Sequence, residues 1–277
     1  MQAGIKFGNK TNKTNLSDDV AEFIDSIANL NGKNLTIYQP TFETYSRNPL
    51  NIDFLETWRR CNQISNENTQ EEKNWQKANC YRVTGDFENG RLEGDGALIL
   101  GKDIPFQQGT YRKGKLEGEA SRGYIDYYLR MVGEIGTFVN DLLEGNNCTR
   151  TNSIINEEGS FLKGKLHGNG TEKTNHWSNE GIFFDGSLIE GTKSIVDVDI
   201  QKISKGKFNE KEKLTGQGKE TLVYIENNQV KEIFEGSFKN GKRDGKGVLL
   251  EPGFLGGISR RDVEYQDGEQ IKTQLAP

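Results

Sequence analysis

Histidine and cysteine are scarce in this 277-residue sequence, which has two histidines and three cysteines. Neither His167 nor His176 has a second histidine or a cysteine at metal-ligand spacing, so we expect no metal site. No nucleophile motif accompanies either histidine, and the carboxylates are spread along the chain instead of being grouped. The sequence therefore predicts a protein that is not an enzyme and that uses no cofactor.

The cysteines leave the cellular compartment open. Cys61 and Cys80 flank a polar segment and could form a disulfide, which would leave Cys148 unpaired. An odd count of cysteines favours reduced thiols in a cytoplasmic protein. The N-terminal residues MQAGIKFGNK contain no apolar segment of the signal-peptide type. We expect a cytoplasmic protein, and the alternative is an exported or periplasmic protein whose signal peptide has been removed.

Basic charge and long apolar runs are also missing. The net charge is −5 and the isoelectric point is about 5.4, whereas nucleic-acid binders usually carry a basic surface. Anionic membranes likewise attract clustered lysine and arginine, so we do not expect lipid binding. No apolar run approaches the roughly 20 residues of a membrane-spanning helix. These absences leave a protein as the expected partner, with a homodimer as one option.

Apolar residues make up only 32% of the chain, but glycine is abundant, with 33 residues. Disordered proteins share a low apolar content. Here, however, 14 Phe, 9 Tyr and 3 Trp are spread along the chain. This composition favours a thin, extended sheet in which each unit buries a few large side chains against its neighbours.

Seven segments of the chain share the pattern G-x-(F/Y)-x-x-G-x-L-x-G-x-G, and a weaker eighth begins at Asp262. The first glycine and the aromatic residue of each repeat are Gly85 and Phe87, Gly109 and Tyr111, Gly136 and Phe138, Gly159 and Phe161, Gly181 and Phe183, Gly206 and Phe208, and Gly236 and Phe238. Residues around each aromatic alternate as in a β-strand, and N-G, K-G or D-G dipeptides follow as hairpin turns.

Each hairpin closes with a G-x-G pair, such as Gly94 and Gly96, which removes side chains from one face of the sheet. We expect the aromatic ring of the neighbouring repeat to lie on this bare backbone. Burial of each ring contributes on the order of 1.5–3 kcal/mol. Because a single hairpin is marginally stable, stacking of the repeats is what stabilises the fold.

The pattern resembles the MORN family (membrane occupation and recognition nexus), whose usual form is Y-E-G-x-F-x-N-G-x-x-H-G-x-G. FEGSFKNGKRDGKG, from Phe234, and KLHGNG, from Lys165, are the best matches, and the resemblance covers roughly residues 81–270. It implies a mainly β fold, an elongated twisted antiparallel sheet with one hairpin per repeat. It also implies a scaffolding, dimerising or protein-docking role.

Several repeats depart from the pattern. Asp141 replaces a turn glycine, Ala120 replaces a closing glycine, and the sixth repeat has two extra turn residues within Asn209–Lys213. In the fifth repeat the closing pair is lost and Gly191 comes one position late. We therefore expect a possible bend at residues 191–204 that divides the array into two sub-sheets.

The first eighty residues lie outside the repeats. Helical spacing of apolar residues predicts helices over 17–30 and 52–62, with a strand at Leu35–Tyr38 between them. The polar residues 63–79 are interpreted as a helix tail or a linker. We interpret residues 1–80 as a small α/β cap over the first hairpin or as a docking region, followed by the array at 81–270 and a tail at 271–277.

One segment between the second and third repeats is rich in residue types that dominate protein interfaces. As candidate partner contacts we select Arg122, Tyr124, Tyr127, Tyr128 and Arg130, together with Trp177 in a later connection. The alternative is an extended strand whose rings pack on the sheet.

The sequence therefore predicts a non-enzymatic protein-binding scaffold, such as a component of a cytoskeletal or ciliary assembly. A bacterial immunity protein that binds and occludes a toxin is the alternative. A regulatory or lipid-binding MORN module is a further one.

Overall fold

A computed structural model describes residues 31–40, 69–100, 104–125, 131–253 and 257–275 of the chain. Within these residues there are eighteen β-strands and one α-helix, and each strand pairing with a recorded register is antiparallel. The mainly β, antiparallel hairpin fold predicted from the sequence is confirmed. The chain divides into two compact units, 1–129 with 133–142, and 130–132 with 143–277, and each is described by itself.

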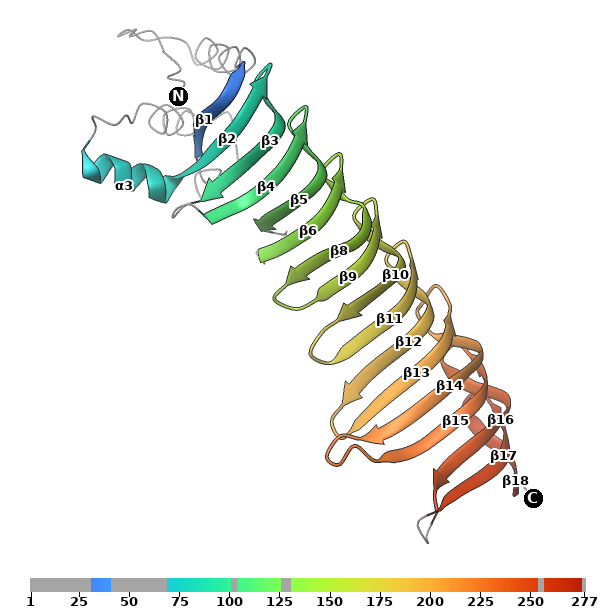
Figure 1. The fold of residues 1–277 in the computed structure, drawn as a ribbon. Helices are drawn as coiled ribbons and strands as arrows, with labels where there is room; N and C mark the ends of the chain where they lie inside the picture. Colours follow the sequence, from blue (N-terminus) through green and yellow to red (C-terminus); the bar gives the residue numbers. More distant parts are fainter. Residues whose placement is uncertain (1–30, 41–68, 101–103, 126–130, 254–256, 276–277) are drawn as a thin grey trace, which may run out of the picture. The chain divides into compact units, whose positions relative to one another are not determined.

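In the first unit, five strands lie side by side in chain order (Figure 1). They are β1 (Gly32–Pro40), β2 (Cys80–Glu88), β3 (Arg91–Leu100), β4 (Ile104–Arg112) and β5 (Lys115–Ile125). The helix α3 (Gln70–Asn79) precedes β2. Its first turn is closed by a capping box, in which Glu72 Oε2 accepts hydrogen bonds from the backbone and hydroxyl of Thr69. The polar segment predicted as a helix tail or linker thus contains a helix.

The strand predicted at Leu35–Tyr38 is present and is longer than expected, because it forms most of β1. β1 pairs with β2 and so covers the outer edge of the first hairpin. Asn31, the residue before β1, also holds the hairpin turn, because its Oδ1 accepts a hydrogen bond from Asn89 N at 2.8 Å. The helices predicted over 17–30 and 52–62 lie outside the described residues, as does Cys61 of the proposed disulfide.

The third hairpin consists of β6 (Met131–Val139) and β7 (Leu142–Leu143), and the division between the two units falls within it. The second unit continues with strands that each pair with the next (Figure 1). They are β8 (Gly145–Asn152), β9 (Asn156–Leu162), β10 (Lys165–Lys173), β11 (Trp177–Phe184), β12 (Ser187–Asp197), β13 (Ile200–Phe208), β14 (Leu214–Tyr224), β15 (Val230–Lys239), β16 (Lys242–Pro252), β17 (Ile258–Gln266) and β18 (Glu269–Leu275).

The hairpin turns have the predicted geometry. In the first turn, Asn89 and Gly90 have φ of 50° and 73°, the left-handed pair that a two-residue type I′ turn requires. Asp141 occupies the same conformation, with φ of 69°, although it is not glycine. It is held by two hydrogen bonds to Leu116, one donated by its backbone N–H and one accepted by its carboxylate.

The aromatic residues and leucines of the repeats lie on one face of the sheet, here called the inner face, and the opposite side is the outer face. They form the core, and each is at most 8% exposed: Phe87, Leu92, Tyr111, Leu116, Phe138, Leu143, Phe161, Leu166, Phe183, Leu188, Phe208, Leu214, Phe238 and Tyr265.

The two glycines of each closing G-x-G pair have different structural roles. A Cβ on Gly170, the second glycine of its pair, would lie 3.6 Å from the ring of Phe183 in the next repeat, which supports the predicted ring-on-backbone packing. A Cβ on the first glycine, Gly94, would meet nothing within 4 Å, but its φ of 71° is left-handed. The first glycine therefore forms a bulge, and only the second makes space for a ring.

The sheet is not divided at residues 191–204, where we expected a possible bend. β12 and β13 pair without a register shift from Glu190 and Lys207 to Asp197 and Ile200. The reason lies in the bulge of the fifth hairpin. Gly191 lies directly opposite Gly181, as Gly96 lies opposite Gly85, and the bulge simply accommodates one residue fewer.

The weak eighth repeat is a complete hairpin. β17 and β18 are joined by a turn at Asp267 and Gly268, and Tyr265 occupies the aromatic position. Opposite this ring the usual leucine is replaced by Gln270, whose Oε1 accepts a hydrogen bond from the Tyr265 hydroxyl at 3.2 Å. This polar replacement leaves Gln270 exposed to solvent.

Candidate protein-docking surface

Of the residues selected for partner contact, Arg122 lies on β5 in the first unit and is engaged within the sheet. Its guanidinium donates two hydrogen bonds to Glu134, a side chain that is only 3% exposed, and lies 5.0 Å from the ring centre of Phe138. These contacts give Arg122 a structural role on the inner face. Tyr124 belongs to β5, but its side chain is not described, and Tyr127, Tyr128 and Arg130 lie outside the described residues.

Trp177 begins β11 and is half-buried. Its backbone N–H donates to Thr174 Oγ1 at 3.1 Å, and the Thr174 N–H donates back to its carbonyl at 2.8 Å. The loop between β10 and β11 is therefore a compact turn, and His176 lies exposed at its tip.

Arginine residues on the inner face of the second unit follow the arrangement of Arg122. Arg150 pairs with Glu157 at 3.2 Å and lies over Phe161. Arg243 pairs with Glu220 at 2.8 Å, and with Glu232, and lies over Phe234. Burial alone would lower the pKa of Arg243, but its hydrogen bonds and the nearby carboxylates raise that pKa above its ordinary value. The inner face is thus a stack of aromatic rings, guanidinium groups and carboxylates.

A further regularity concerns the residue after each repeat leucine, which the sequence pattern treats as variable. Where this residue is acidic, its carboxylate accepts a hydrogen bond from a backbone N–H in the next hairpin turn, as Glu93 does from Lys113 at 2.7 Å. Glu117 and Glu144 make the same contact, and so does Asp244, which follows Arg243 at the leucine position of the seventh repeat. The L-E-G triplet of the early repeats is the sequence signal for this contact.

The fourth and fifth repeats carry His167 and Ile189 at this position instead of an acid. The His167 ring packs against Phe184, with the ring centres 5.0 Å apart. Phe184 is 60% exposed although it is a large aromatic residue, and it directly follows the buried Phe183. The sequence analysis assigned His167 no metal-binding or catalytic role and did not select Phe184 or Ile189.

Exposed apolar side chains surround Phe184 and His167 on four consecutive strands, β9 to β12. We define the apolar patch as Leu162, His167, Ile182, Phe184 and Ile189. Its four aliphatic and aromatic members other than His167 are each 40–60% exposed. A contiguous group of this kind on a sheet surface is typical of an interaction site.

The patch continues into a hollow of about 930 Å³ that is lined by Phe184, Ile189, Phe208, Lys211 and Lys213 together with neighbouring polar residues. One wall of the hollow is the extended turn of the sixth repeat. Asn209 holds this turn, because its Oδ1 accepts hydrogen bonds from Lys211 N and Lys213 N, each at 3.0 Å. The two extra turn residues noted in the sequence thus shape one side of the hollow.

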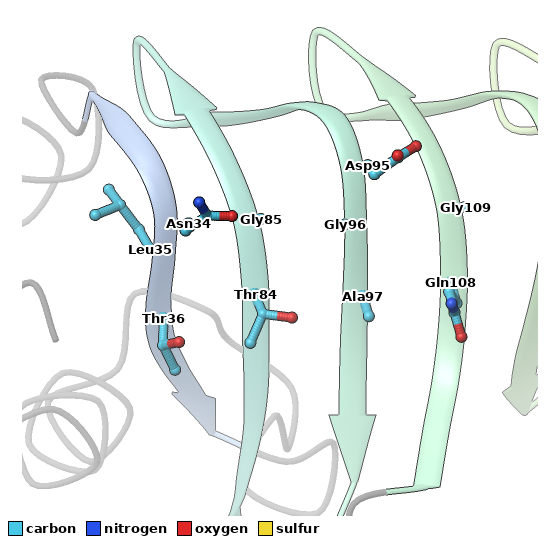
Figure 2. Close-up of a pocket in the computed structure, with 10 residues that line it drawn as sticks. All are labelled: Asn34, Leu35, Thr36, Thr84, Gly85, Asp95, Gly96, Ala97, Gln108 and Gly109. Atoms are coloured by element: carbon cyan, nitrogen blue, oxygen red, sulfur yellow. The ribbon is translucent and has the colours of Figure 1, made fainter. Parts of the chain in front are cut away.

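A second hollow, of about 380 Å³, lies in the first unit across β1 to β4 (Figure 2). It is lined mainly by glycines and small polar side chains, including Thr36, Thr84 and Asp95. Asp95 Oδ1 already accepts a hydrogen bond from the Thr110 hydroxyl at 3.1 Å. This lining offers hydrogen-bonding groups and little apolar surface for an anchor side chain.

The hairpins, bulges and stacked rings described above are those of a known repeat. The sequence profile of the MORN repeat matches residues 158–175 and 234–250. The chain therefore contains MORN repeats. MORN repeats occur in protein-binding and membrane-binding modules. The first match covers most of β9 and β10, which carry two members of the apolar patch.

No curated protein matches the chain. The described residues contain no group of three or more His, Cys, Asp or Glu side chains that could hold a metal ion. Within the same described residues, no helix is long and apolar enough to cross a membrane.

Proposed function

We propose that this MORN protein is a non-enzymatic scaffold that docks a partner protein on the apolar patch of its second unit. The observation that supports this proposal is the exposure of Phe184 beside His167, which holds the position where several other repeats place a backbone-binding acid. Exposed aromatic and aliphatic side chains beside a hollow are the anchors that dominate protein interfaces.

The charges around the patch favour a protein over an anionic lipid surface. Lys211 and Lys213 line the hollow, but Asp185 and Glu210 line it too. A mixed rim matches the polar rim of protein–protein interfaces, whereas lipid-binding surfaces concentrate positive charge. The overall charge of −5 acts in the same direction.

We propose a cytoplasmic setting in a cytoskeletal or ciliary assembly, with a toxin-occluding immunity protein as the alternative. The thiols separate a reduced from an exported protein. Cys148 is fully buried, so it should react with a thiol reagent only after denaturation. Three reactive thiols in denatured, unreduced protein favour the cytoplasmic setting, and one favours a Cys61–Cys80 bridge and export.

Docking is tested by capturing partners from the native source with the wild-type chain and two variants. The first variant combines Phe184→Ser with Ile189→Ser. The second, Val198→Ser, is the matched control, because Val198 is 86% exposed but lies outside the patch, between β12 and β13.

We expect a partner that is retained by the wild type and by Val198→Ser and is lost with the double variant. The affinity of the purified partner should fall at least tenfold in the double variant, since anchor residues each contribute about 1–2 kcal/mol or more. Equal capture by all three chains would refute docking on this patch.

A further inference from the structure

Three polar side chains of the second unit meet on the inner face of strands β9, β10 and β11. Glu172 on β10 lies directly opposite Glu157 on β9 and opposite Asn179 on β11. Asn179 Nδ2 donates a hydrogen bond to Glu172 Oε2 at 3.2 Å. The asparagine side chain is therefore directed at the carboxylate of Glu172.

The carboxylates around Glu172 and Asn179 are not all matched by cations. Arg150 pairs with Glu157 at 3.2 Å, and Lys193, opposite Asn179, pairs with Glu212 at 2.7 Å. Glu172 has no ion-pair partner among the described residues. Burial raises the pKa of its carboxyl group above the ordinary value, and the neighbouring Glu157 adds to this effect. Arg150 and Lys193 are thus each paired with another carboxylate, and the charge of Lys193 offsets only part of the rise in the pKa of Glu172.

Asn179 also lacks a donor, because one of its side-chain atoms accepts no hydrogen bond. The residue is only 2% exposed, and its Oδ1 has no hydrogen-bond partner in the described part of the chain. A buried acceptor without a partner costs about 1–3 kcal/mol. The Glu172 carboxylate, which has no ion-pair partner among the described residues, therefore lies beside Asn179 Oδ1, which accepts no hydrogen bond. A positively charged hydrogen-bond donor would satisfy both groups.

We propose that Glu172 and Asn179 form a receptor for a lysine or arginine side chain of the partner protein. An ammonium or guanidinium group carries positive charge and several donors, so it can satisfy Glu172 and Asn179 Oδ1 together. The half-buried ring of Trp177, two residues before Asn179 on the same face of β11, provides an aromatic surface beside this position. The inference rests on the proposed function, in that the cation belongs to a protein.

The receptor formed by Glu172 and Asn179 lies on the inner face, and the apolar patch lies on the outer face. The two proposals can therefore be refuted independently. Loss of partner capture in the patch variant tests the docking function. The receptor is tested separately, with short peptides and the full-length chain.

The probe is the tripeptide acetyl-Ala-Arg-Ala-amide, with acetyl-Ala-Gln-Ala-amide as the neutral control. Binding is followed through the side-chain NH₂ signal of Asn179 in ¹⁵N-labelled protein. The variant is Glu172→Gln, and its matched control is Glu158→Gln. Glu158 is exposed on the adjacent β9, and its substitution removes the same charge from the outer face.

We expect the arginine peptide to shift the Asn179 signal saturably, with at least tenfold weaker binding in Glu172→Gln and unchanged binding in Glu158→Gln. The neutral peptide should leave the signal unmoved. Equal binding by both variants would overturn the proposal, as would absence of any shift. Mg²⁺ and spermidine form a further arm, and tighter binding of either than of the arginine peptide would assign the site to a free cation and overturn the protein source.

Discussion

Phe183 and Phe184 are adjacent in the chain but lie on opposite faces of β11, so they offer a direct test of how the two faces differ. Phe183 is 1% exposed in the core of the inner face, whereas Phe184 is 60% exposed in the apolar patch. We compare Phe183→Ala with Phe184→Ala. The two substitutions remove the same atoms from neighbouring positions, so their difference isolates burial from residue type.

The magnitude follows from the area that each ring removes from water. A phenylalanine side chain offers about 200 Å², and apolar burial is worth about 25 cal/mol per Å². Phe183 buries nearly all of this area, which gives about 5 kcal/mol, in line with the roughly 3–5 kcal/mol measured for buried Phe→Ala. Phe184 buries about two-fifths of it, or at most about 2 kcal/mol, because extended-chain areas are upper bounds. We therefore expect the two variants to differ by about 3 kcal/mol.

The assay is urea unfolding of the full chain followed by far-UV circular dichroism. The slope of the transition is compared first, because a repeat array can lose cooperativity when one repeat is weakened. Phe183→Ala should move the midpoint to a much lower urea concentration than Phe184→Ala does. A cost below about 1 kcal/mol for Phe183→Ala, or equal costs for the two variants, would refute the assignment of the faces.

Three further predictions concern the repeat glycines, the ion pair of Arg243 with Glu220, and the pKa of Glu172. Gly181→Ala should cost at least about 2 kcal/mol in urea unfolding, because its Cβ would lie 2.1 Å from Glu190 O. Gly118→Ala, at an open position with φ of 95°, should lose only about 1 kcal/mol of backbone strain; the reverse order of costs would contradict the packing. Arg243→Leu should lower the melting temperature, because it removes one of the two cations paired with the buried Glu220 at a cost of about 2 kcal/mol, and an unchanged melting temperature would exclude this role. Burial raises the pKa of Glu172 above its usual 4.5, so the folded state holds this proton more tightly than the unfolded state does. Wild-type stability should then fall as the pH rises from about 4.5 through the raised value, and Glu172→Gln should melt higher than wild type at pH 7 but not at pH 4. A variant that melts lower at pH 7 would show that the carboxylate stabilises the fold.

The repeat architecture was predictable because its physics is local. A hairpin turn needs two left-handed residues in succession, a bulge needs a left-handed glycine, and a strand alternates its side chains with a period of two. Each requirement is met within about a dozen residues, so it recurs visibly in the sequence. The aromatic positions from Phe87 to Phe238 followed from the same pattern, and each is buried. Strand pairing continues through residues 191–204, where we expected a possible bend, because the bulge could shorten by one residue without disturbing the register.

The candidate site was not predictable in this way, because it depends on pairings between strands. Arg122 looked like an interface residue, but only the fold showed that it binds the buried Glu134. The contact of Asn31 with Asn89 joins residues 58 positions apart, which no local pattern encodes.

By itself, the sequence determined the MORN hairpins, their turns and their buried rings, since each is set by neighbouring residues. The tertiary structure alone decided which residues are left exposed or unsatisfied. The exposure of Phe184 beside His167, and the meeting of Glu172 with Asn179, arise from the register of adjacent strands. Register is a property of the whole sheet, because every strand is positioned by the one before it.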